Sequence, residues 1–260
     1  MSLHHPAQNH LLASLTPAEI DRLRPTLDVV PMPSGRVVHE ELLPQEYVYF
    51  PTGAIIALLH GGTGVPAWTA LVGCEGVVGI ASFLGGDTTP GQAIVQSSGY
   101  AYRMPSSVFN AEFRRRGRMR DIAFACTQAL IAQITRVAVC RRHHTLEQQV
   151  SRWLLLSADR LRRPRLAVGL GVMLRILGAP HERVLNVLAV LQARGMVRFD
   201  RGAIDIVDRA GLVDTACDCY GAVASEYDRL LGTRFVAASS GATSLTQGHT
   251  LGGAELAVAQ

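Results

Sequence analysis

The side chains in this sequence that could bind a metal ion or form a disulfide include five cysteines and a pair of adjacent histidines. Thiolates and imidazoles bind metal ions, and thiols also form disulfides. The cysteines are Cys74, Cys126, Cys140, Cys217 and Cys219. Their number is odd and no C-x-x-C spacing occurs, so the spacing indicates neither a disulfide framework nor a zinc site. We therefore expect no metal and no cofactor.

His143 and His144 also invite a metal or haem interpretation. Neighbouring residues on a helix point about 100° apart, so the two rings cannot share one ion without further ligands. We expect His144 to make a structural hydrogen bond instead. Cys74 as a haem ligand has no partner motif in the sequence. A haem- or metal-based gas sensor is therefore the weakest functional hypothesis.

All 25 basic residues of the chain are arginines, and they are unevenly distributed. Residues 101–202 hold 19 Arg against 6 acidic residues, a net charge of +13, whereas residues 1–100 carry −5 and residues 203–260 carry −4. Codon preference in a GC-rich genome would explain arginine in place of lysine, but it would not explain this clustering. The basic middle segment indicates a polyanionic partner.

Sequence motifs of common enzymes are absent from the chain. The sequence contains no Walker P-loop, no G-x-S-x-G and no H-E-x-x-H, so we expect that the protein is not an enzyme. We find no run of 18 apolar residues and no signal-like N-terminus, which predicts a cytoplasmic protein without a membrane partner.

The first hundred residues have the sequence pattern of a β-rich domain. Thr16, Pro17 and Glu19 form a capping box that starts a short helix. From residue 28 to 104, short β-branched runs alternate with Gly- and Pro-containing turns, as in 47–53 (YVYFPTG). This pattern predicts a β-barrel or sandwich.

A helical period begins near residue 105, and the segment 119–142 contains neither Pro nor Gly. A helix of that length projects more than about 30 Å, beyond what a small domain needs. We therefore interpret it as a connecting helix that pairs with its own copy in a homodimer; an ordinary core helix is the alternative. The predicted dimer face comprises Ile122, Cys126, Ala129, Leu130, Gln133 and Val137.

Residues 146–232 have the pattern of a second domain. A helix over 146–161 precedes two helix-compatible stretches, 166–177 and 180–194, with Gly178-Ala179 between them. A hairpin over 196–207 follows. Two helices joined by a short turn and then a hairpin are typical of a winged helix-turn-helix. Residues 233–260 are rich in Ser, Gly, Thr and Ala and are expected to be a disordered tail.

This order of elements resembles the Crp/Fnr superfamily of transcription regulators. The segments 47–53 and 71–79 (LVGCEGVVG) are similar to barrel motifs of one subgroup. The segment 140–155 (CRRHHTLEQQVSRWLL) is similar to its hinge, and 192–197 with 208–212 match its wing region. The resemblance covers about residues 8–225.

The resemblance implies an α+β fold: a jelly-roll, cyclic-nucleotide-binding-like barrel (8–118), a dimerisation helix (119–145), a winged helix-turn-helix (146–232) and the tail (233–260). Gly79 and Ile80 stand where nucleotide-binding members carry G-E-L, and Thr89 stands near their R-S/T-A. Without that Glu and Arg, a buried cyclic phosphate would lack partners. We expect an effector pocket at these three positions that does not bind cyclic AMP in the usual way.

For the DNA-reading helix, alignment on Val184 implies base contacts from His181, Glu182, Arg183 and Asn186. Phosphate contacts are expected from five arginines: Arg162, Arg163, Arg165, Arg198 and Arg201. The segment 166–177 lacks the usual L-T-x-x-x-[LI]-A signal.

The sequence therefore predicts a homodimeric, sequence-specific regulator of unknown effector that binds double-stranded DNA. RNA polymerase and a small-molecule effector are its other expected partners. The alternative is a dimeric interaction protein whose degenerate helix-turn-helix no longer binds DNA.

Overall fold

The N-terminal half of the protein folds into two antiparallel sheets. The computed structural model describes residues 4–61, 67–200 and 202–232. One sheet has the order β1-β7-β3 and the other the order β2-β6-β4-β5. The strands are β1 (Asp28–Met32), β2 (Val37–His39), β3 (Tyr47–Pro51), β4 (Ile55–His60), β5 (Ala67–Val72), β6 (Gly91–Ser97) and β7 (Gly99–Pro105). Two facing sheets are compatible with the predicted jelly-roll.

Short helices close this domain at its ends. They are η1 (Pro6–Gln8), α1 (His10–Ala13), α2 (Pro17–Leu23), η2 (Arg24–Thr26), α3 (Ala81–Leu84) and α4 (Ser106–Arg114). The predicted capping box is confirmed at α2: the Thr16 side chain accepts from the backbone of Glu19, and the Glu19 carboxylate accepts from the backbone of Thr16.

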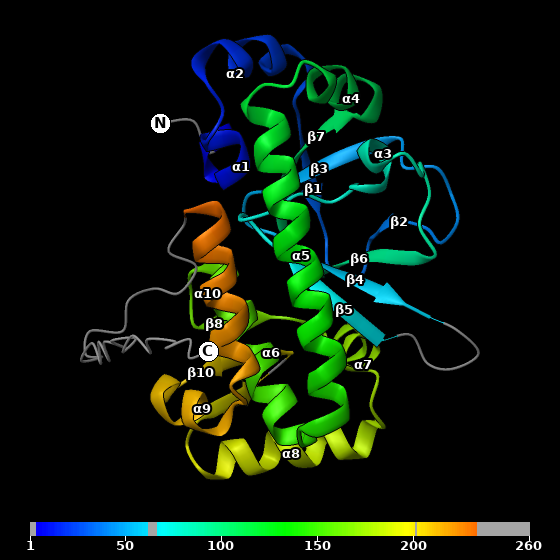
Figure 1. Ribbon diagram of the computed structural model, residues 1–260. Coiled ribbons are helices and arrows are strands. Elements are labelled where there is room, and N and C mark those ends of the chain that lie inside the picture. The colour runs from blue at the N-terminus through cyan, green and yellow to red at the C-terminus, as the bar shows by residue number, and fades with distance from the viewer. Residues whose placement is uncertain (1–3, 62–66, 201, 233–260) are drawn as a thin grey trace, which may run out of the picture.

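Helix α5 (Arg118–His143) runs the length of the molecule, with the sheets on one side and α10 (Cys219–Leu231) along its flank (Figure 1). It is the one helix of the described part that is long and apolar enough to cross a membrane, although the sequence has no uninterrupted run of 18 apolar residues. Its apolar residues are instead divided between the protein core and an exposed stripe.

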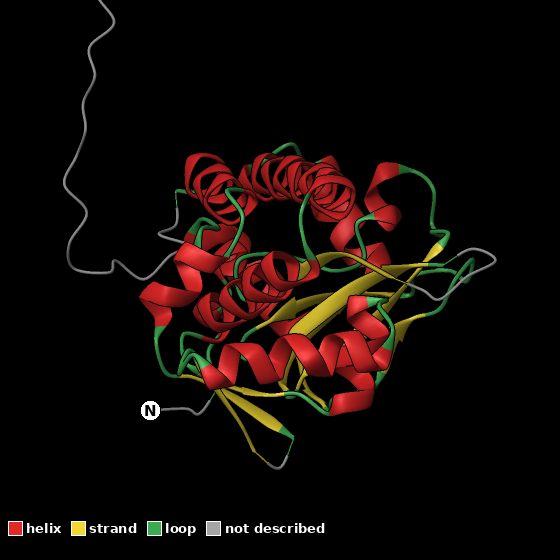
Figure 2. Cartoon of the chain, turned by 90° about the horizontal axis from the view of Figure 1, so that it is seen from below, coloured by secondary structure: helices red, strands yellow, loops and turns green. Residues whose placement is uncertain are grey.

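The C-terminal module follows α5 through a sharp hinge at His144. Its elements are α6 (Leu146–Leu161), β8 (Arg165–Ala167), α7 (Leu170–Leu177), α8 (His181–Ala193), β9 (Val197–Asp200), β10 (Ala203–Ile206) and α9 (Arg209–Thr215). Strands β8, β10 and β9 form a small antiparallel sheet. Figure 2 shows the hairpin of β9 and β10 protruding beside the helices. The helix predicted over 166–177 begins only at Leu170, because Leu166 pairs with Ile204 in that sheet.

One hydrophobic core joins the module to the sheets. Trp153 and Leu154 of α6 are fully buried and belong to the same cluster as Ile55 and Leu71 of the sheets. The Trp153 indole donates to the side chain of Gln96 on β6, at 3.1 Å. The predicted tail lies outside the described residues.

A buried ion pair crosses this junction. The guanidinium of Arg160 on α6 lies 2.8 Å from the carboxylate of Glu75, and both side chains are almost completely buried. Arg160 also donates to Gln133 of α5 and to the carbonyl of Leu71. Gln133 in turn donates to the hydroxyl of Tyr227 on α10, at 2.9 Å. This Glu75–Arg160 network therefore ties together the sheets, α5, α6 and α10.

We predict that Glu75→Gln lowers the free energy of unfolding by about 3–5 kcal/mol, because it leaves the buried guanidinium of Arg160 without its counter-charge. Urea unfolding measures this loss. The matched control is Glu147→Gln, whose partner Arg194 is 53% exposed, and we expect a loss of about 1 kcal/mol or less there. Equal losses in the two variants would contradict the prediction.

Candidate nucleic-acid interface and effector pocket

Helices α7 and α8 form the two helices of a helix-turn-helix. The turn between them is possible because Gly178 adopts a left-handed conformation, which costs a glycine little. Val184, Leu188 and Leu191 bury one face of α8 against the module. The four residues predicted to read bases are all exposed, near the N-terminus of α8: His181, Glu182, Arg183 and Asn186. The structure thus places all four in the first two turns of α8.

The predicted wing is present as the hairpin of β9 and β10, and Arg198 on β9 is exposed. Arg201, at the tip of the hairpin, lies outside the described residues. Arg165 is exposed on β8, but its guanidinium already pairs with Asp205 of β10, at 3.0 Å. A phosphate would therefore compete with this carboxylate for Arg165.

Arg162 and Arg163 are not brought close to α8. Glu147 at the start of α6 pairs with Arg194 just after the C-terminus of α8. Arg162 follows the other end of α6, where its guanidinium lies against the ring of His10 of α1, and α1 and α8 lie towards opposite ends of the molecule (Figure 1). The expected backbone contacts of these two arginines therefore have no support from the arrangement of the helices.

Part of the basic middle segment is structural. Arg152 and Arg160 are buried, with 1% and 4% of their surface exposed. The guanidinium of Arg152 lies 4.9 Å from the centre of the Trp68 ring. The net charge of the segment therefore overstates the positive charge available to a polyanion.

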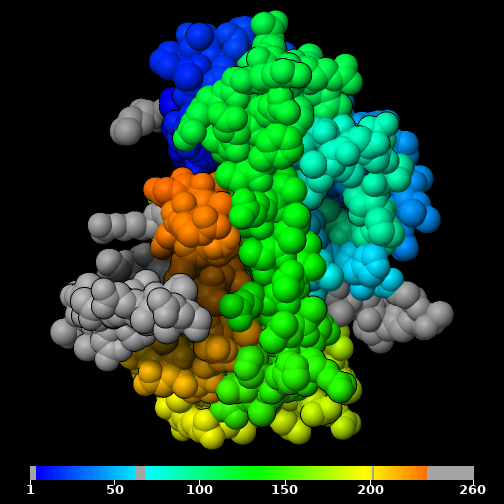
Figure 3. Space-filling view, in the orientation of Figure 1, coloured from blue at the N-terminus to red at the C-terminus, as the bar shows by residue number. Residues whose placement is uncertain are grey.

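The six residues predicted to form the dimer face lie inside the protein instead. Ile122, Cys126, Ala129, Leu130, Gln133 and Val137 are all less than 9% exposed. They pack against the sheets and α10, because the apolar face that the sequence shows most clearly is the one that the chain covers itself. The opposite face of α5 carries exposed Phe124, Ile131 and Val139. Figure 3 shows α5 lying open along the front of the molecule.

A cavity of about 410 Å³ lies between the second sheet, the loops around α3, and α5. Gly79, Ile80 and Thr89, the three positions predicted for the effector pocket, all line it. Leu130 and Ile134 of α5 close one side. Its volume falls in the range of small-molecule sites. None of the described residues that line it is Arg, Lys, Asp or Glu.

Two polar side chains in the cavity wall are without partners among the described residues. They are His39, through Nε2, and Gln45, through Oε1, and both are buried. Burial lowers the pKa of His39 to about 4, so its ring is neutral at pH 7. Sequence reasoning missed both residues, since neither belongs to a motif. Together they can donate and accept hydrogen bonds to an uncharged ligand.

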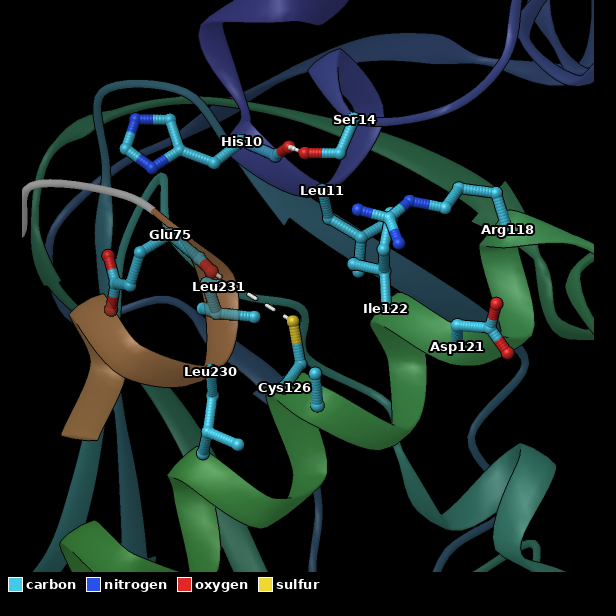
Figure 4. A pocket seen from close by; sticks show the side chains of 11 residues that line it. His10, Leu11, Ser14, Glu75, Arg118, Asp121, Ile122, Cys126, Leu230 and Leu231 are labelled. Atoms are coloured by element: carbon cyan, nitrogen blue, oxygen red, sulfur yellow. Dashed lines mark hydrogen bonds between the residues drawn. The ribbon is translucent and has the colours of Figure 1, made fainter.

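A second cavity, of about 60 Å³, lies between α1, α5 and the end of α10 (Figure 4). Leu11, Ile122 and Leu231 line it beside Glu75. It is too small for an effector. Burial raises the pKa of the Cys74 thiol, close to this region, to about 11, so the free thiol is protonated at neutral pH.

Solved structures share this arrangement over most of the chain. TTHA1359, a Crp/Fnr-family transcriptional regulator from Thermus thermophilus, is 17% identical with a TM-score of 0.55, and the match covers 73% of this chain and 98% of that one. The CRP-family regulator TTHB099 from the same organism is 14% identical (TM-score 0.57, 81% and 100% covered). The c-di-GMP-responsive regulator CLP of Xanthomonas campestris is 14% identical (TM-score 0.59, 74% and 99% covered).

The chain has the Crp/Fnr fold. No family model and no curated protein sequence matches it. In this Crp/Fnr-fold chain the cavity lies in the N-terminal domain of two sheets, and the helix-turn-helix and wing lie in the C-terminal module.

We predict that His39 makes folding sensitive to mild acid. The unfolded ring titrates near 6.5 and the buried ring near 4, so protons bind the unfolded state preferentially between these values. The stability is complete above about pH 6.5 and falls as the pH drops towards 4, with a loss of about 2 kcal/mol by pH 5. The measurement is urea unfolding at pH 7.5 and at pH 5. The drop in the free energy of unfolding between these pH values should be about 2 kcal/mol smaller in His39→Gln than in the wild type.

The matched control is His143→Gln, at an exposed position on α5, which should keep the pH dependence of the wild type. An unchanged pH dependence in His39→Gln would show that the buried ring is not the cause.

Proposed function

We propose that the protein is a homodimeric, sequence-specific DNA-binding transcription regulator of the Crp/Fnr type. It would act in the cytoplasm with RNA polymerase, and its activity would be set by a small molecule in the sensor cavity. The observation that carries the proposal is the set of exposed polar side chains on α8 within a complete winged helix-turn-helix. Such a helix enters the major groove with its N-terminal residues on the base edges.

The chemistry of these side chains suits base recognition. Arg183 can donate two hydrogen bonds to guanine, and Asn186 can pair with adenine. Glu182 can accept from the amino group of cytosine. Arg198 on the wing would contact the phosphate backbone, which supplies affinity without sequence preference.

The exposed stripe on α5 supports the homodimer. Phe124, Gln128, Ile131, Thr135 and Ala138 recur at alternating intervals of four and three, which is the spacing of a coiled-coil seam. All five are exposed within one chain. A second α5 packed along this stripe would bury its large apolar members, Phe124 and Ile131, and would place the two copies of α8 on one side of a dimer.

The cavity defines the class of effector. A cyclic nucleotide would bring a phosphate into a wall without a cation among its described residues, at a cost of several kcal/mol. A largely apolar, uncharged molecule with a polar group that reaches His39 and Gln45 fits instead. We therefore propose an effector of that class, and not cyclic AMP.

The cavity wall also contacts the helix-turn-helix. Gln92 of β6 lines the cavity, and its side chain accepts a hydrogen bond from Arg175 of α7. A ligand that engages Gln92 or shifts Ile134 would change how α7 docks on the sheet. Differential binding to docked and undocked states would then shift the population of DNA-binding dimers.

One observation favours the alternative, a dimeric interaction protein. The C-terminal part of the exposed face of α8 carries Ala189, Val190 and Ala193 instead of polar groups. Val190 is 40% exposed. A DNA-reading face is usually polar throughout, so this surface could instead contact a protein.

We predict that the protein binds its own upstream DNA and that Arg183→Ala weakens the specific complex by tenfold or more, since a bidentate base contact contributes about 1–3 kcal/mol. Arg198→Ala should weaken binding to every sequence alike and lower the salt slope by about 1. Fluorescence anisotropy across a salt series measures both effects. Cyclic AMP should leave the affinity unchanged.

The matched control is Arg163→Ala, an exposed arginine at the far end of α6, which should keep wild-type affinity. If binding does not depend on DNA sequence and is unchanged in Arg183→Ala, α8 does not recognise specific bases. That result would support the interaction-protein hypothesis.

We also predict that Ile131→Glu converts the dimer to a monomer, because it puts a charge at the centre of the apolar stripe on α5. Multi-angle light scattering at micromolar concentration gives the mass directly. Leu43→Glu, at a residue that is 56% exposed on the barrel, is the control and should remain dimeric. A dimeric Ile131→Glu protein would place the interface elsewhere.

A further inference from the structure

Four side chains with metal-binding atoms meet at the hinge between α5 and α6. Cys140 lies in the last turn of α5, and His144 caps that helix one turn later. Cys217 lies in the turn between α9 and α10, and Cys219 is the first residue of α10. The four ligand atoms all lie within 4.8 Å of one another, and the three cysteines are buried. Segments more than 70 residues apart thus converge on one point.

We propose that Cys140, His144, Cys217 and Cys219 bind one zinc ion. Four ligands at about 2.3 Å from a tetrahedral zinc stand about 3.8 Å from each other. In the structure the Cys140 and Cys217 sulfurs are 3.5 Å apart, and the Cys219 sulfur is 3.7 Å from Nδ1 of His144. Three thiolates and one imidazole form a recognised set for structural zinc.

The orientation of the imidazole agrees with metal binding. Nδ1 of His144 faces the sulfurs, while Nε2 faces the carboxylate of Asp218, at 3.7 Å. Zinc-bound histidines commonly direct their second ring nitrogen to a carboxylate, which orients the ring and fixes its tautomer. Asp218 stands between Cys217 and Cys219 in the sequence, so one short turn supplies two ligands and this carboxylate.

A buried arginine gives an independent indication of an anionic centre. Arg152 of α6 is 99% buried, as only 1% of its surface is exposed. Its Nε and Nη1 have no hydrogen-bond partner among the described residues. Its charge acts on Cys140, Cys217 and Cys219 alike. A zinc ion with three thiolates and a neutral imidazole carries a net charge of −1, which would compensate this guanidinium.

The site would hold α10 against the end of α5. Cys140 and His144 follow the part of α5 that lines the sensor cavity, and Cys217 and Cys219 follow the wing and α9. A bound ion would therefore restrict movement of the C-terminal module around the hinge. This role is independent of the proposed function, since it requires neither DNA nor an effector.

The test is the metal content of the full-length protein. The protein is purified without chelators, and its bound metal is measured by elemental mass spectrometry. We expect about one zinc per chain, and its loss in Cys219→Ser and in His144→Ala. The matched control is Cys126→Ser, at a buried cysteine outside the cluster, which should keep its zinc.

Because a variant could lose zinc by failing to fold, the wild-type protein is also stripped of metal and reloaded with cobalt. Visible absorption bands of tetrahedral cobalt with thiolate ligands would support the site, and the melting temperature should rise on reloading with zinc. A metal-free protein that gives no such bands would overturn the proposal. So would a disulfide between Cys140 and Cys217, detected as a mass two units lower that returns on reduction.

Discussion

The buried ion pair of Arg160 and Glu75 is the constraint around which the two halves of the protein are arranged. Two opposite charges that are removed from water must stay together. The loop after β5 that carries Glu75 therefore cannot separate from helix α6 without leaving a buried charge unpaired. Gly73 permits this approach, because a Cβ there would lie 2.9 Å from the Cβ of Arg160. Gln133 and Tyr227 extend the pairing to α5 and α10.

The cavity between the second sheet and α5 lies beside this network and shares elements with it. Leu130 and Ile134 of α5 line the cavity on either side of Gln133 in the sequence. On β6, Gln92 lines the cavity, while Gln96, four residues further along the strand, pairs with Ser157 and Trp153 of α6. The cavity wall and the C-terminal module are therefore joined by packed, hydrogen-bonded side chains of β6 and α6.

The cysteine cluster lies at the other end of the same helix pair. Tyr227 contacts α5 through Gln133, while Cys217 and Cys219 contact it near Cys140, so α10 is attached to α5 at two levels. Between them lie apolar contacts that leave the opposite face of α5 exposed. That free face is the one that a second copy of the chain can cover.

Local sequence determined the elements themselves. The capping boxes, the apolar period of 146–161 and the turn glycine at Gly178 act over a few residues, and so the helices, the wing and the Crp/Fnr order followed from them. Tertiary structure alone decided which side chains meet. Burial of Arg152 and Arg160, the inward direction of Ile122 and Leu130, and the meeting of Cys140 with Cys217 depend on packing between distant segments. Sequence periodicity marks an apolar face without naming the surface that covers it.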